Sequence, residues 1–517
     1  MKGALCLSRP RARRKSMHGA GRQPSPEPGS DGREALRAVR PWRVPCAAAL
    51  CGLALASWSP RARAQGAPPP RPLMLEEVLD STATHFPLIE AARQDAESAR
   101  MELLAAQGGF DPELKARAAA FPLGPYTYSR LEALVQQPTP YHGATVFGGW
   151  RRGDGEIPPY YGNLETLSAG ELRAGVTVPL WRNGPVDRRR ATLERARLGR
   201  TAAELSVRQA VLESSRQAAH RYWDWVAAGR RRAIAVELLE FARVRDAQLA
   251  QRVRKGDLAA FELTDNQRAL AQRESQVVAA ERLLTQAALE LALYLRDADG
   301  RPVPLRPEQL PGGFPSIDAP PPATEPLDDV LERRPDVSRL EAQAAQQRTE
   351  ARFAANQQAP LIDVTVAAAQ DLGSGPARLR KTELEMGVVL EVPVLNRVAQ
   401  GRDGSARAAV ARAEAQLRLQ RERAAVEVGD ARAALDASRS RVQLARREAA
   451  AARELAVGER TRLLQGDSSL LIVNLREQTA AEAQVREVDA LSEYFKVTAT
   501  LRAALALPVA GAAPEGN

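Results

Sequence analysis

Four segments of the chain alternate between apolar and polar residues with a period of two, the pattern of a β-strand with two unlike faces. The clearest runs from 384 to 394, where every even position is apolar and the odd positions include two glutamates, a glycine and a proline. Residues 172 to 180 repeat the alternation, and shorter versions lie at 362 to 368 and 114 to 120. Tilted membrane-spanning strands of about 9 to 11 residues have this length and pattern. The sequence therefore predicts four amphipathic strands.

Between these segments, apolar residues recur in narrow stripes with helical spacing on a background rich in alanine and charge. Residues 184 to 295 are predicted to form two helices joined at Gly256-Asp257, and residues 402 to 507 two helices joined at Gly466-Asp467. At 1.5 Å per residue, the first helix of each pair would be about 95 to 110 Å long. Each glycine allows the positive φ that reverses a helix, and the aspartates are expected to cap the first amides of the following helix.

The strands and helices occur in two copies along the chain. Leu75-Glu-Glu-Val-Leu and Leu327-Asp-Asp-Val-Leu open the copies, and each is followed by a proline-led helical segment, at Pro87 and Pro335. Both copies also contain a Val-Pro at the end of the main strand, before the long helix. Because the same landmarks recur in the same order, the chain is interpreted as a tandem duplication.

The duplication sets the domain organisation and the fold class. Nine prolines between 301 and 326 exclude a helix or a central strand there, so this segment is the linker between the repeats. The predicted domains are a leader at 1–64, a first repeat at 65–300 with strands at about 111–181, the linker at 301–326, a second repeat at 327–507 with strands at about 361–394, and a disordered tail at 508–517. The expected fold is mixed but mainly α, with long antiparallel helices arranged as a coiled coil or helical barrel, together with amphipathic strands.

The excess of positive charge lies in the N-terminal segment alone. The chain has 73 Lys and Arg against 63 Asp and Glu, but residues 1 to 64 hold 13 of the basic and 3 of the acidic residues. The remainder is balanced, so no nucleic-acid partner is expected. Basic residues before the apolar stretch 44–58, and Ala62-Arg63-Ala64 after it, have the form of an export signal with Gln65 as the first mature residue. A lipoprotein signal at Cys51 is the rival interpretation, although Leu50 argues against it.

The residues that support enzymatic chemistry are few. All three cysteines lie in the leader, and the remaining histidines, His85, His142 and His220, fall on different elements. Neither a metal cluster nor a catalytic triad is indicated, and no phosphate-binding glycine loop is present. We therefore expect no catalytic residue, no metal and no cofactor. No run of 18 or more apolar residues follows residue 64, so no membrane-spanning helix is predicted.

Aromatic residues gather in the strand region of the first copy, as expected for belts at a membrane interface. They are Tyr126, Tyr128, Tyr141, Phe147, Trp150, Tyr160, Tyr161 and Trp181. The alternative is that these aromatic residues form the core of a small β-domain. The first copy is also longer here, and the extra segment within 121–170 contains further alternating residues around Pro138-Thr-Pro140. The sequence leaves open whether it is an added hairpin or an extracellular loop.

Taken together, these features resemble the TolC-like outer-membrane efflux channels. The resemblance covers about residues 73 to 507 and lies in the ordered set of openings, strand ends and Gly-Asp turns, in duplicate. It implies a homotrimer in the outer membrane, in which four strands from each chain form a twelve-stranded transmembrane β-barrel and the helices form a tunnel across the periplasm. It also implies a periplasmic adaptor at the helical tips, with an inner-membrane transporter behind it, for tripartite efflux or type I secretion.

The resemblance also assigns the tip residues. The family's tip pattern, R-x-x-x-G-x-x-S-x-x-D-V-L, is matched only in part, because Ala259 stands at the serine position in the first copy and an apolar residue stands at the aspartate position in the second. The residues assigned to adaptor contact are Arg252, Gly256, Asp257, Leu263, Arg462, Gly466, Asp467 and Ser469. Arg460, Arg462 and Asp467 are candidates for a charged gate, with a solvated helix face as the alternative.

Two functions from different classes follow from the sequence. One is a passive trimeric export duct, and the other is a periplasmic coiled-coil adaptor or scaffold without membrane strands. The amphipathic strands favour the duct, as do two helical hairpins where an adaptor is expected to have one. The cargo stays open among drugs, metal ions and polypeptides.

Overall fold

A computed structural model describes residues 71–158, 160, 165–318, 323 and 325–509. The leader at 1–64, with its export signal, the lipoprotein alternative and all three cysteines, lies outside the described residues, as do Tyr161 and residues 510–517 of the tail. Val509, which the sequence assigns to the tail, is buried among apolar residues of the helical region.

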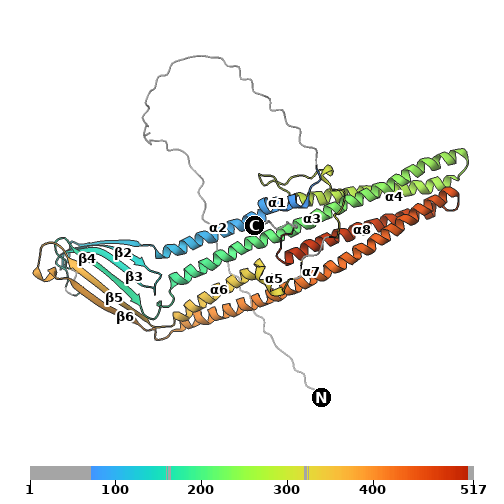
Figure 1. Ribbon diagram of the computed structural model, residues 1–517. Helices are drawn as coiled ribbons and strands as arrows, with labels where there is room; N and C mark the ends of the chain where they lie inside the picture. The colour runs from blue at the N-terminus through green and yellow to red at the C-terminus, as the bar shows by residue number, and fades with distance from the viewer. Residues whose placement is uncertain (1–70, 159, 161–164, 319–322, 324, 510–517) are drawn as a thin grey trace, which may run out of the picture. The chain divides into compact units, whose positions relative to one another are not determined.

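The described chain is built from helices and one sheet, in the same order in both repeats (Figure 1). The α-helices are α1 (Leu75–His85), α2 (Pro87–Gln107), α3 (Arg188–Lys255), α4 (Ala260–Ala292), α5 (Leu327–Arg333), α6 (Pro335–Asn356), α7 (Arg397–Gln465) and α8 (Leu470–Ala504). The strands are β1 (Glu113–Phe121), β2 (Tyr128–Pro138), β3 (Thr145–Gly155), β4 (Glu171–Pro179), β5 (Leu361–Asp371) and β6 (Glu383–Glu391).

The two long helices, α3 and α7, have nearly the same length, 68 and 69 residues. Each is therefore about 100 Å long. Helix α3 begins at Arg188, four residues after the predicted start, and α7 begins at Arg397, five residues before it. Asp187 accounts for the start of α3, because its side chain accepts a hydrogen bond from the Arg190 amide and so caps the helix.

The sheet has six strands in the order β1-β2-β3-β4-β5-β6, and every neighbouring pair is antiparallel. Pairing of β4 with β5 joins the two repeats into one sheet. The prediction of four strands was wrong, because the extra segment of the first copy adds β2 and β3 as a hairpin between β1 and β4. Glycines and alanines weaken the alternation in this hairpin, which is why its strands are harder to recognise in the sequence.

The strand register collects apolar side chains on one face of the whole sheet. This face carries Leu114, Ala116, Ala118 and Ala120 of β1, Leu131, Ala133 and Val135 of β2, Val146, Gly148 and Trp150 of β3, Leu172, Ala174, Val176 and Val178 of β4, Ile362, Val364, Val366 and Ala368 of β5, and Leu384, Met386, Val388 and Leu390 of β6. We call it the apolar sheet face. No part of the described chain covers it over β6, where Leu384, Met386 and Val388 are about 70% exposed.

The opposite face of the sheet is polar, and its charged residues form pairs between strands. Arg151 of β3 contacts Glu171 of β4 at 2.5 Å, and the glutamate side chain is only 2% exposed. Arg173 of β4 pairs diagonally with Glu385 of β6 across β5, where their neighbours are the small Ala369 and Ala367. The two faces therefore differ as strongly in the structure as the alternating sequence predicts.

Helix α7 packs through a seam with a strict seven-residue repeat. From Ala424 to the end of the helix, the buried residues of α7 are Ala424, Val428, Ala431, Leu435, Ser438, Val442, Ala445, Ala449, Ala452, Ala456 and Glu459. Steps that alternate between four and three residues are the pattern of a left-handed coiled coil, and alanine allows close approach of the partner helix. Near the turn, the seam residues Ala449, Ala452 and Ala456 pack against Ala480 and Ala483 of α8. Among the helices of the described residues, none combines the length and apolar character needed to cross a membrane.

Candidate functional site

The turns that end the long helices are built alike. Gly256 follows α3 with φ of 81°, and Gly466 follows α7 with φ of 86°, both in the left-handed region. The amide of Asp257 donates to the carbonyl of Arg252 at 3.0 Å, and that of Asp467 to the carbonyl of Arg462 at 2.9 Å. These bonds close the helix ends as glycine C-caps do, so both glycines and both arginine carbonyls have a structural role.

The predicted helix caps were wrong. The residue that precedes α4 is Ala259, which makes no side-chain cap, and the residue that precedes α8 is Ser469, whose hydroxyl accepts from the Ile472 amide. Asp257 and Asp467 lie two residues earlier, directly after the glycine, where their amides complete the preceding helix. Their side chains are therefore free of the capping role and are exposed at the tips.

The assigned tip residues surround these two turns. Arg252, Gly256 and Asp257 are exposed at the first turn, and Leu263 lies half-buried one helical turn into α4. At the second turn Arg462, Gly466, Asp467 and Ser469 are exposed. Three apolar side chains that the sequence did not single out are also exposed at the tips. These are Phe261, Leu464 and Leu471, which are 70% exposed or more.

The three gate candidates do not act as one group within the chain. Arg462 and Asp467 are close, because the Arg462 guanidinium donates to the Asp467 carbonyl at 3.3 Å. Arg460 instead points into the helical bundle, where its Nε donates to Glu477 of α8 at 2.8 Å and its guanidinium lies over the ring of Phe241 at 3.7 Å. The charge of Arg460 is therefore paired with Glu477, between two helices of the same chain.

Glu477 is the centre of a charged network that involves all four helices of the two hairpins, α3, α4, α7 and α8. Its carboxylate is fully buried and contacts three arginines: Arg245 of α3, Arg273 of α4 at 3.1 Å and Arg460 of α7 at 2.8 Å. Asn474, one turn earlier on α8, accepts from Arg245 at 2.7 Å. We call these five residues the Glu477 network. Because α3 and α4 come from the first repeat and α7 and α8 from the second, the network fixes one hairpin to the other near the tips.

The arginines decide the ionisation state of this carboxyl group. Burial alone would raise the pKa of Glu477, but the charge of Arg245 and the hydrogen bonds from Arg245 and Arg460 outweigh it, so the pKa is lowered from 4.5. Glu477 is therefore ionised at neutral pH. A buried carboxylate with three cationic partners depends on all of them being present, since an unpaired buried charge is costly.

Sequence reasoning missed Arg245, Arg273 and Glu477. Arg245 and Glu477 are 232 residues apart, so no local pattern connects them. Asn266 of α4 and Asn474 of α8 follow their turns by ten and eight residues, and both lie in the packed region, where Asn266 is 1% exposed and Asn474 accepts from Arg245. An asparagine within the packing stripe of a coiled coil is typical of a polar contact in the seam.

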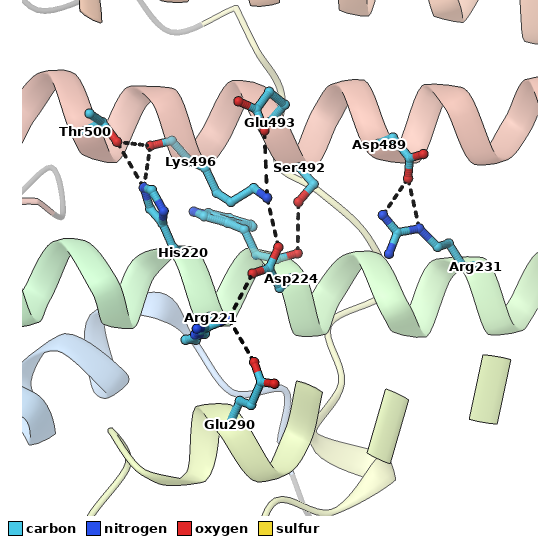
Figure 2. A network of polar contacts seen from close by, with 11 residues as sticks. His220, Arg221, Asp224, Arg231, Glu290, Asp489, Ser492, Glu493, Lys496 and Thr500 are labelled. Atoms are coloured by element: carbon cyan, nitrogen blue, oxygen red, sulfur yellow. Dashed lines mark hydrogen bonds and ion pairs between the residues drawn. The ribbon is translucent and has the colours of Figure 1, made fainter. Parts of the chain in front are cut away.

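A second set of polar contacts joins α3 to α8 nearer the sheet (Figure 2). Asp224 contacts Lys496 at 2.9 Å, Arg231 contacts Asp489 at 2.6 Å, and the Nε2 atom of His220 lies 3.0 Å from the Thr500 hydroxyl. Burial and the nearby charge of Arg216 lower the pKa of His220. Together with the Glu477 network, these contacts fasten the repeats to each other along α3 and α8.

Within the described part of the chain, no three His, Cys, Asp or Glu side chains gather closely enough to hold a metal ion. His85, His142 and His220 lie on α1, on the β2–β3 turn and on α3. His220 has a packing role, in contact with α8.

Solved structures with the same fold are outer-membrane channels. The chain aligns with MtrE of Neisseria gonorrhoeae, an outer-membrane channel, at 17% identity, over 85% of this chain and 90% of that one, with a TM-score of 0.61. The CmeC outer-membrane channel of Campylobacter jejuni aligns at 15% identity over 84% and 85%, with a TM-score of 0.59. The outer-membrane protein VceC of Vibrio cholerae aligns at 17% identity over 84% and 97%, also with a TM-score of 0.59.

This chain has the fold of the TolC-like outer-membrane channels. No protein-family model matches the sequence, and no curated protein matches it. The likeness is therefore one of structure, and it extends over both the helical hairpins and the sheet, since it covers more than four fifths of this chain.

We predict that removing the carboxylate of the Glu477 network lowers the stability of this channel fold strongly. Glu477→Ala leaves three arginines without their shared partner and should lower the free energy of unfolding by about 3 to 5 kcal/mol. The matched control is Glu448→Ala, which breaks the half-exposed pair with Arg486 and should have a much smaller effect, because water screens an exposed ion pair. Denaturant unfolding followed by circular dichroism measures both. Equal effects of the two substitutions would contradict the assigned role.

The same network predicts a pH dependence. Because the folded-state pKa of Glu477 is lowered, its contribution to stability is present above the ordinary value of 4.5 and is lost as the pH falls through the lowered value. The difference in melting temperature between the wild type and Glu477→Gln should therefore be largest near pH 7 and should shrink below about pH 4.5. Thermal unfolding at a series of pH values tests this. A difference that stays constant down to pH 3 would show that Glu477 is not ionised in the fold.

Proposed function

We propose that the chain is a subunit of an outer-membrane efflux channel, that three copies assemble around a common axis, and that its helices extend into the periplasm. The single observation that carries the proposal is the apolar sheet face, which the described chain leaves exposed on β6. Soluble monomers rarely expose a contiguous apolar surface of this extent. A lipid environment accounts for it.

The dimensions of the sheet fit a bilayer. Its strands are 9 to 11 residues long, the length that a strand tilted by about 45° needs to cross the hydrocarbon core. Aromatic residues lie at both strand ends: Tyr126 and Tyr160 pack edge to face beyond β1 and β3, while Tyr141 and Trp181 are exposed at the helical end. Membrane proteins place tyrosine and tryptophan at the two interfaces in this way.

The edges of the sheet support assembly with copies of the same chain. In the described residues β1 and β6 each pair with one strand only, so each has a row of backbone groups without a partner in this chain. Such an edge is costly in hydrocarbon. Because the sheet has an even number of antiparallel strands, β6 of one copy can pair antiparallel with β1 of the next, and the ring closes.

The helical part supports a passive duct that works with partners. Helices of about 100 Å carry the tips far from the sheet, and the tips expose the apolar residues Phe261, Leu464 and Leu471 beside Arg252, Asp257, Arg462 and Asp467. We propose that this tip surface, with Gly256, Leu263, Gly466 and Ser469, binds a periplasmic adaptor connected to an inner-membrane transporter. Arg462 and Asp467 are the part of the proposed gate that remains at the tip.

A pair of adjacent substitutions tests the lipid-facing assignment. Val388 lies on the apolar sheet face of β6, and Val389 lies on the opposite face. Val388→Lys should reduce recovery in the outer-membrane fraction, since a lysine facing lipid costs about 2 to 4 kcal/mol near the middle of the bilayer. Val389→Lys should be recovered like the wild type. Equal recovery of both variants would contradict the assignment, and a soluble periplasmic wild type would favour the adaptor or scaffold alternative.

A charge at the tip tests adaptor binding. Phe261→Asp places a carboxylate in the exposed apolar surface of the first turn and should abolish co-purification with the host's adaptor, while the mass of the assembly stays unchanged. The matched control is Gln272→Asp, which adds the same charge at an exposed site about 16 Å further along α4 and should leave co-purification intact. If Phe261→Asp co-purifies with the adaptor as the wild type does, this tip is not the contact surface.

A further inference from the structure

The hairpin of β2 and β3 bears on the proposed channel itself, because the sequence left open whether it is part of the membrane wall or an extracellular loop. We infer that the hairpin is part of the transmembrane wall, so that a three-fold assembly closes with eighteen strands instead of twelve. The inference rests on the proposed function and concerns how many strands form the wall when the sheets of three copies join edge to edge.

The first support is the apolar side of the hairpin. Leu131 and Val135 of β2 lie beside Ala118 and Leu114 of β1, and on β3 Trp150 lies beside Leu172 of β4. The hairpin thus continues the apolar sheet face from its helical end as far as Leu131 and Trp150, and nearer the loop end β3 carries Arg152 and Asp154 on this face. An extracellular hairpin surrounded by water has no need for an apolar side in this register.

The second support is on the polar side. Directly opposed residues form a row of alternating charge across four strands, Arg117, Glu132, Arg151 and Glu171. The row includes a residue of β2 and a residue of β3, and the Arg151–Glu171 ion pair fastens β3 to β4. Opposite charges directly across a strand pair stabilise pairing. On both β1 and β4, the hairpin therefore has apolar neighbours on one sheet face and oppositely charged neighbours on the other.

The third support is the length of the hairpin. Both β2 and β3 have 11 residues, at least as many as every other strand of the sheet. Their connecting turn reaches the helical end, where Gly143 has φ of 71° and packs so closely that a Cβ there would lie 2.6 Å from the Asn183 carbonyl oxygen, just before α3. The hairpin thus spans the sheet from its loop end to the start of the helices.

The wider wall also matches the helical ring. Helices α2, α3, α6 and α7 join strand ends in each chain, so three chains bring twelve helices to the sheet. At about 8 to 10 Å between axes, twelve helices have a circumference of about 100 to 120 Å. Strands about 4.8 Å apart and tilted by about 40 to 45° occupy about 6.5 Å of the rim each, which gives about 115 Å for eighteen strands and about 80 Å for twelve.

The consequence concerns where the channel can select its cargo. Barrel diameter grows roughly linearly with strand number, so the outer segment is about one and a half times as wide as a twelve-stranded one, in the range of porins that keep an aqueous lumen. The membrane segment then offers little resistance to solutes. Control of passage falls to the helical tips.

Cysteine accessibility tests the inference, because the chain has no cysteine after residue 64. Single cysteines replace Leu131 and Val135 on β2, Val388 on β6 and Leu123 in the β1–β2 loop, each in the full chain reconstituted into liposomes. A water-soluble maleimide reports exposure, and the unsubstituted chain gives the background. All four side chains are exposed in the isolated chain, from 44% to 90%, so protection reports the membrane and the assembly.

We expect Leu131→Cys and Val135→Cys to be protected to the same degree as Val388→Cys, at least tenfold slower than Leu123→Cys. Image reconstruction of the detergent-solubilised trimer should show eighteen strands. If Val388→Cys is protected while Leu131→Cys and Val135→Cys react as the loop does, or if the trimer shows twelve strands, the inference fails and the proposed function stands. If Val388→Cys also reacts as the loop does, the proposed function fails as well.

Discussion

The structure depends on a constraint on backbone hydrogen bonding in the sheet. Strands β1 and β6 each have one partner in the described chain, and the face that they share is apolar. A backbone N–H or C=O group can be left without a protein partner in water but not in hydrocarbon, where no solvent replaces the bond. The proposed channel meets this constraint by closing the sheet on further copies of the same chain. On this argument, the position in the membrane and the assembly state have one cause.

The helices connect the sheet to a second location, the helical tips. The alanine seam of α7 and the coiled-coil packing of α8 give a stiff element about 100 Å long, whose stability does not require a large apolar core. Since such seams are narrow, further contacts are needed to hold the first repeat in a fixed position against the second. The Asp224–Lys496 and Arg231–Asp489 pairs along α3 and α8, and the buried Glu477 network near the tips, supply them. These contacts join the first repeat to the second at two levels between the sheet and the tips.

Much of the fold could be predicted from local patterns. The period of two located β4, β5 and β6, the absence of proline located α3 and α7, and the glycines located both turns, because each pattern reports a local conformational requirement. The sequence left the β2–β3 segment open between an added hairpin and a loop, because Ala133, Gly148 and Gly149 weaken its alternation, and the strand register was needed to place it in the sheet. The helix caps were misplaced by two residues, since Asp257 and Asp467 complete the preceding helix. The Glu477 network was unpredictable from one sequence, because its members meet only when two repeats pack together.

The most direct test of this account is fractionation of the native host's envelope, followed by the mass of the detergent-solubilised protein. The account predicts recovery in the outer membrane, as a species of about three times the mass of the mature chain. A soluble periplasmic monomer or dimer would contradict it, because the apolar sheet face and the two open edges would then be stable in water.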